Sequence, residues 1–81
     1  MDYKAIVITA IENITGAPAE DLENETSFNL RESGILDSLS CATLASALRD
    51  KIGRKFKSDK MTLEDFTSVD TILAAISRIM K

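Results

Sequence analysis

The chain has 81 residues, 44% of them hydrophobic, with one proline, three glycines and a formal net charge of −3. This length and composition predict one packed domain over residues 1–81 and exclude a disordered chain. The acidic balance gives no support to nucleic-acid binding, and the absence of histidine excludes Ser–His–Asp and Cys–His catalytic sites and removes the commonest metal ligand.

Apolar residues at helical spacing predict a first helix near the start of the chain. Its stripe consists of Tyr3, Ile6, Val7, Ala10, Ile11 and Ile14. Gly16 and Pro18 end this helix, because glycine suits the position after a helix and proline cannot continue one. Residues 16–36 show no sustained period, so we expect a long loop that is pinned across the core by its own apolar residues. These anchors are Leu22, Phe28, Leu30, Ile35 and Leu36.

A second apolar stripe predicts a helix between Asp37 and Gly53. The stripe consists of Cys41, Leu44, Ala45, Leu48 and Ile52. Asp37 lies directly before this helix, where its carboxylate accepts hydrogen bonds from backbone N–H groups of the first turn. Cys41 belongs to the stripe and has no basic neighbour in sequence, so we expect a buried core residue rather than a second reactive thiol.

Capping-box patterns at residues 62–65 and 67–70 predict two further helix starts. The first opens a short helix, with Leu63 and Phe66 as its anchors. The second opens a final helix, whose apolar face is formed by Val69, Ile72, Leu73, Ile76, Ile79 and Met80. No segment alternates like a strand, so we expect an all-α fold. It is an antiparallel bundle of three main helices plus one short helix, with the long loop between the first and second helices.

The segment Gly-Ile-Leu-Asp-Ser-Leu at residues 34–39 carries the clearest chemical signal. It places Ser38 in the first turn of a helix, beside the capping residue Asp37. Free N–H groups and the helix dipole favour an anion at this position, and a first-turn hydroxyl is accessible to another protein. A phosphodiester on Ser38 fits these conditions. The alternative is that Asp37 and Ser38 only cap a helix.

This motif and the order of the elements resemble the acyl carrier protein family, which includes carriers of amino acids and peptides. The resemblance covers nearly the whole chain, from the first helix and the long loop to a last helix that follows residues 64–69. It implies that Ser38 is esterified by 4′-phosphopantetheine, which a separate transferase takes from coenzyme A. Asp37 and Leu39 flank the attachment site, and the terminal thiol of the arm holds cargo as a thioester.

The resemblance implies a monomeric carrier without enzymatic activity or a metal site. Its partners are a phosphopantetheinyl transferase and the acyl-loading and acyl-processing enzymes of fatty-acid, lipid or polyketide-type synthesis. An acyl cargo is favoured because Cys41 and Ala45 face Val69, Ile72, Leu73 and Ile76, which would leave an apolar space beside the arm. Alanyl, other aminoacyl or peptidyl cargo is the alternative, since alanyl carriers share the motif. A helical interaction module, regulated by phosphorylation of Ser38 or acting as a structural adaptor, is a further rival.

The second predicted helix departs from the family pattern. Carriers of bacterial fatty-acid synthesis have an acidic second helix, whereas here the only acid after the motif is Asp50, between Arg49 and Lys51. The residues expected to face a partner beside Ser38 are Leu39, Ala42, Thr43, Ser46 and Arg49. These departures indicate a specialised carrier with its own partners.

Residues 49–60 form a basic run of six cationic side chains against Asp50 and Asp59. The run is either a docking patch for an acidic partner or a solvated face. The single cysteine excludes an internal disulfide, and the sequence shows no leader peptide and no apolar run long enough to span a membrane. We therefore expect a cytoplasmic protein that does not bind membranes.

Overall fold

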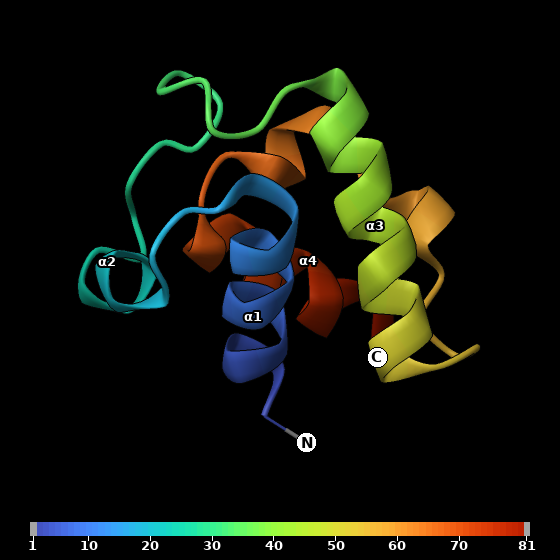
Figure 1. Ribbon diagram of the computed structural model, residues 1–81. Coiled ribbons are helices and arrows are strands. Elements are labelled where there is room, and N and C mark those ends of the chain that lie inside the picture. The colour runs from blue at the N-terminus through green and yellow to red at the C-terminus, as the bar shows by residue number, and fades with distance from the viewer. Residues whose placement is uncertain (1, 81) are drawn as a thin grey trace.

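The computed structural model describes residues 2–80 as a bundle in which three longer helices surround one apolar core (Figure 1). The helices are α1 (Tyr3–Thr15), α2 (Ala19–Asn24), α3 (Ser38–Ile52) and α4 (Val69–Met80), with 3₁₀ helices η1 (Ser58–Lys60) and η2 (Leu63–Phe66) between α3 and α4. Residues 2–80 contain no strand, so the predicted fold class is confirmed. No helix within this range is long and apolar enough to cross a membrane.

The predicted loop between the first two main helices contains α2, a helix of six residues. Such a short helix spans less than two turns, so its sequence contains no repeat of apolar residues at helical spacing. Only Leu22 of α2 is buried, while Glu20 and Asp21 lie in its first turn, where acidic side chains are favoured by the helix dipole.

The same segment is fastened to the start of α4 by backbone hydrogen bonds. Leu30 N–H donates to Thr67 O at 2.7 Å, and Asp70 N–H donates to Thr26 O at 3.0 Å. Of the predicted anchors, Leu22, Leu30 and Leu36 are buried and Ile35 is half-buried. The prediction that Phe28 is a buried anchor is wrong, because Phe28 is 41% exposed and borders a surface hollow at α2.

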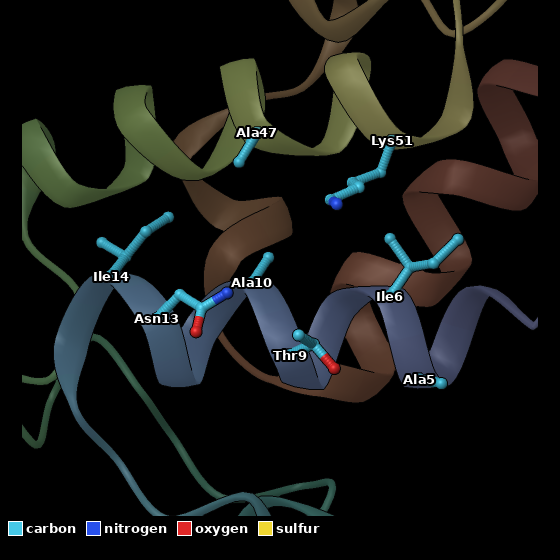
Figure 2. Close-up of a pocket in the computed structure, with 8 residues that line it drawn as sticks. All are labelled: Ala5, Ile6, Thr9, Ala10, Asn13, Ile14, Ala47 and Lys51. Carbon is cyan, nitrogen blue, oxygen red and sulfur yellow. The ribbon is translucent and has the colours of Figure 1, made fainter.

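The buried face of α1 is wider than the predicted stripe. Ile8 lies outside that stripe yet is only 3% exposed, because α1 contacts α2 as well as α3 and α4. Ile6 and Ile14, by contrast, are only half-buried. Both border a groove of about 280 Å³ between α1 and α3 (Figure 2). The small side chains of Ala10 and Ala47 point into this groove and do not fill it.

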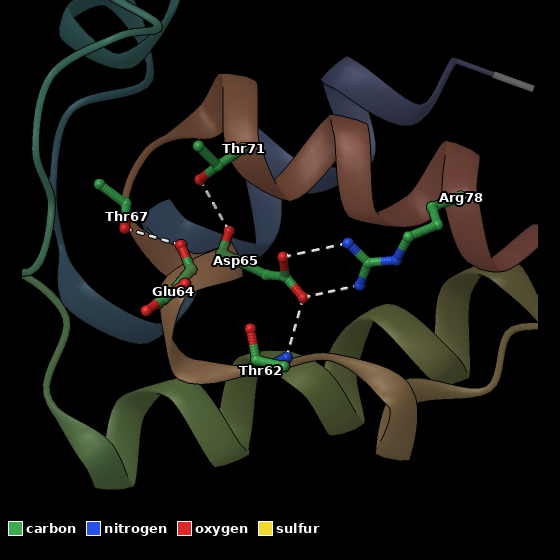
Figure 3. Close-up of polar contacts among 6 residues, drawn as sticks. All are labelled: Thr62, Glu64, Asp65, Thr67, Thr71 and Arg78. Atoms are coloured by element: carbon green, nitrogen blue, oxygen red, sulfur yellow. Dashed lines mark hydrogen bonds and ion pairs between the residues drawn. The ribbon is translucent and has the colours of Figure 1, made fainter.

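Asp65, in η2, connects the segment before α4 to α4 itself (Figure 3). Its carboxylate accepts from Thr62 N–H at 2.8 Å and pairs with Arg78 at 2.9 Å, which confirms the first predicted capping box. The hydrogen bond from Arg78 lowers the pKa of Asp65 below its ordinary value. The Thr71 hydroxyl also donates to Asp65 O at 2.8 Å. These contacts fix η2 against α4, and therefore fix the side chains that η2 presents to α3.

The second capping box begins at Ser68, one residue later than predicted. Ser68 N–H donates to Thr71 Oγ1 at 2.9 Å and Thr71 N–H donates to Ser68 Oγ at 3.2 Å, so the reciprocal pair is Ser68 and Thr71. The physical reason is that Thr67 still belongs to the turn of η2, with φ −64° and ψ −41°. Its side chain is held within that turn, where the hydroxyl donates to Glu64 O at 2.7 Å, and Ser68 caps α4 instead.

Candidate functional site

Ser38 is the first residue of α3 and is exposed. Asp37 is the N-cap residue: its backbone is extended and its Oδ1 accepts from Ser40 N–H at 2.8 Å. Asp37 O accepts the first helical hydrogen bond, from Cys41 N–H at 2.9 Å. The predicted cap is therefore confirmed. Within residues 2–80 the Ser38 hydroxyl has no hydrogen-bond partner, since Asp37 caps the helix through Ser40 N–H.

The turn before Ser38 is held by two buried leucines and one glycine. Leu30 is 0% and Leu36 is 2% exposed, and Leu36 N–H donates to Leu30 O at 3.0 Å. Between them Gly34 adopts φ +84°, in the left-handed region that side chains with a Cβ rarely adopt. These residues direct the chain out of the core at Asp37, so that α3 begins at the surface.

The carboxylate of Asp37 is stabilised in its charged form. The Ser40 backbone N–H is the main cause that lowers the pKa of Asp37 below its ordinary value of 3.8. Asp37 is fully exposed, so its negative charge remains beside Ser38 at neutral pH.

We expect Asp37→Ala to lower the urea midpoint at pH 7, and Asp37→Asn to change it far less, because asparagine also caps helices and alanine does not. The lowered pKa means that charged Asp37 contributes stability above pH 3.8, which is lost as the pH falls through the folded-state value. Below pH 3.8, the urea midpoint of the parent should therefore approach that of the Asn variant. Equal midpoints for the parent and the Ala variant at pH 7 would show that the cap does not stabilise α3.

A depression of about 210 Å³ lies directly beside Ser38. One wall belongs to α3 and consists of Ser38, Cys41, Ala42 and Ala45; the other comes from the 58–66 segment and consists of Ser58, Met61, Thr62, Leu63 and Phe66. This second wall was not predicted. Leu63, which was predicted to anchor the short helix, is instead 51% exposed on this wall, whereas Phe66 is buried as predicted.

The predicted apolar space is confirmed on its α3 wall, because Cys41 and Ala45 border the depression beside Ser38, and it is wrong on its α4 wall. Val69, Ile72 and Ile76 are at most 1% exposed and belong to the same packed cluster as Cys41, and none of them borders the depression. The α4 side chains are therefore closely packed, and the depression lies between α3 and the 58–66 segment instead.

Cys41 is a core residue, as predicted. Its side chain is 3% exposed, and burial raises the pKa of its thiol above the ordinary value of 9.0. A thiol that is protonated at neutral pH is a poor nucleophile. Cys41 therefore shapes the inner wall of the depression and does not provide a second reactive group beside Ser38.

The surface around Ser38 is apolar. Leu39 is 78% exposed directly after Ser38, and Leu63 is half exposed on the opposite wall of the depression. Exposed leucines beside an accessible hydroxyl are typical of a protein-binding surface. The residues predicted to face a partner are all exposed, as expected; they are Leu39, Ala42, Thr43, Ser46 and Arg49.

Comparisons with known proteins agree with this geometry. Residues 5–76 match the family described as phosphopantetheine attachment site. The chain is 27% identical over 78 residues to D-alanyl carrier protein 2 of Lactiplantibacillus plantarum, covering 96% of this chain and 94% of that relative. No solved structure matches. The chain belongs to the phosphopantetheine attachment family, whose members are not enzymes but carriers that hold 4′-phosphopantetheine covalently and work with transferases and processing enzymes.

Proposed function

We propose that Ser38 carries the 4′-phosphopantetheine arm, and that the chain shuttles a small aminoacyl group of the D-alanyl class as a thioester. The observation that carries the assignment is the position of Ser38, exposed and without a hydrogen-bond partner at the start of α3, within the matched residues 5–76. Ser68 also precedes a helix, but it is 4% exposed and its hydroxyl accepts from Thr71 N–H. Of the two serines at the starts of α3 and α4, Ser38 is therefore the one that is exposed.

The start of α3 suits a phosphodiester because it supplies free N–H groups and the positive end of the helix dipole. Asp37 satisfies the N–H of Ser40 and begins the helix, so the hydroxyl of Ser38 stays outside that network. The bound arm would supply a thiol that forms the thioester. The chain itself orients the attachment point and presents it on an exposed apolar surface formed by Leu39 and Leu63.

The small cargo is supported by the named relative, a D-alanyl carrier protein, and by the packing of the core. A long alkyl chain gains about 0.8 kcal/mol per methylene only where it leaves water, and the core beside Cys41 and Ile72 is closely packed. An aminoacyl group keeps its ammonium in water, which avoids the cost of burying a charge.

Cargo identity is tested by loading. The holo-protein is incubated in an extract of Lactiplantibacillus plantarum with ATP and radiolabelled D-alanine or octanoate, and the hydroxylamine-labile label on the chain is counted. We expect D-alanine to label the holo-protein and octanoate not to label it. Ser38→Ala, which has no attachment hydroxyl, is the control and should remain unlabelled with both. Labelling by octanoate alone would contradict the proposed cargo and favour an acyl carrier.

A further inference from the structure

A further hollow, of about 290 Å³, is lined by residues from the end of α3 and from the segment that follows it. Figure 1 shows that this segment turns back along α3. It is lined by Arg49, Arg54, Phe56, Lys57, Ser58 and Asp59. Three cationic side chains and only one carboxylate, that of Asp59, therefore line the hollow. The other basic residues of the 49–60 run, Lys51, Lys55 and Lys60, do not line it.

The three cations have no ion-pair partner among the described residues 2–80. Arg78–Asp65 is the only ion pair among residues 2–80, so Arg49, Arg54 and Lys57 contact no carboxylate within 4.0 Å. Their side chains are exposed. Like charges held around one cavity repel one another, so an anionic group that entered it would be attracted by all three.

The hollow has a fixed floor. Phe56 is 0% exposed and anchors the loop in the core. The loop is closed on either side of it, since Phe56 N–H donates to Gly53 O at 3.1 Å and Ser58 N–H donates to Phe56 O at 3.1 Å. A purely solvated basic run requires no such anchoring. Here Arg54 and Lys57 precede and follow the buried Phe56 in a turn that these hydrogen bonds constrain.

The hollow adjoins the depression beside Ser38. Ser58 lines both the hollow and the depression beside Ser38. Arg49 follows Ser38 by about three helical turns, roughly 16 Å along α3, and so lies on the same face of that helix. A protein that covers Ser38 therefore meets exposed leucine at one end of this face and unpaired positive charge at the other.

We infer that the hollow lined by Arg49, Arg54 and Lys57 is a docking site for an acidic surface of the partner enzyme. The inference rests on the proposed function only in identifying that partner as an enzyme that acts on the arm at Ser38. Complementary charge raises the association rate and selects among partners more than it adds affinity. The hollow favours enzymes with an acidic rim around their active site and repels enzymes with a basic rim.

The test is an NMR titration of the unmodified chain with hexaglutamate, which requires neither the arm nor the cargo. We expect amide shifts centred on Arg54, Lys57 and Ser58 that disappear at high salt. Arg54→Glu and Lys57→Glu should each weaken binding roughly five-fold. Both side chains are exposed and unpaired, so these variants should fold. Lys4→Glu makes the same charge change on α1, at a residue that does not line the hollow, and should leave binding unchanged.

Three outcomes would overturn the inference. Shifts spread over all lysines and arginines would show non-specific attraction, and the absence of shifts would show that the run is a solvated face. Tighter binding of a hexadeoxynucleotide at the same residues would show a nucleic-acid site instead. Because the unmodified chain is used, each of these results is independent of whether Ser38 carries the arm.

Discussion

Ser38→Ala should abolish the mass gain of one phosphopantetheine that the parent acquires from coenzyme A and a broad-specificity transferase. The loss should be complete, because the variant has no hydroxyl at the exposed start of α3 where the phosphodiester would form. The fold should survive, since Asp37 caps the helix through Ser40 N–H and the Ser38 side chain has no partner within residues 2–80. Intact-mass analysis and the helical circular dichroism signal measure the two effects separately.

Ser46→Ala is the matched control for this experiment. Ser46 is also exposed on α3, about two turns beyond Ser38, but it lies within the helix rather than at its start. The control variant should gain the same mass as the parent. A mass gain in Ser38→Ala, on Ser58 or any other serine, would contradict the assignment and show that the transferase recognises the surface rather than the helix start.

Leu48→Ala should cost about 2–5 kcal/mol of unfolding free energy. Leu48 is 0% exposed on the inner face of α3 and belongs to the cluster that joins this helix to α1 and α4. The total unfolding free energy of a native domain is roughly 5–15 kcal/mol, so the loss is a large fraction of it. In a marginally stable domain, this loss would unfold much of the population. Urea unfolding, followed by circular dichroism, measures it.

Leu39→Ala makes the same substitution on the same helix at a side chain that is 78% exposed. Its unfolding free energy should remain within about 0.5 kcal/mol of the parent. The contrast between the two variants separates the loss of core packing from any effect of alanine on helix propensity. Equal midpoints for both variants would show that α3 does not bury the face that contains Leu48.

The main helices were predictable because their sequence signals are local. The apolar stripe of α3 and its limits at Asp37 and Gly53 follow from residue spacing and capping chemistry, and the structure confirms them. Helix α2 was not predictable, because one buried leucine in six residues gives no period. The shift of the α4 cap from Thr67 to Ser68 depended on where the preceding 3₁₀ turn ended, which the capping pattern alone does not specify.

The candidate site divides in the same way. Ser38, Asp37 and the exposed Leu39 belong to one short segment, so their arrangement follows from the start of a helix. The second wall of the depression comes from residues 58–66, which reach α3 only through tertiary packing. The burial of Phe56 was not predictable either, because a single aromatic residue among charged residues forms no apolar pattern. In the structure it is fully buried and forms the floor of the basic hollow.

The most direct test of the central claim is to locate the arm by mass spectrometry of a tryptic peptide from the modified parent. Cleavage after Arg31 and Arg49 releases residues 32–49, which contain Ser33, Ser38, Ser40 and Ser46. The account predicts that this peptide alone gains one phosphopantetheine and that its fragment ions place the added mass on Ser38. Fragment ions that place the mass on another of these serines, or a gain confined to a different peptide, would contradict the account.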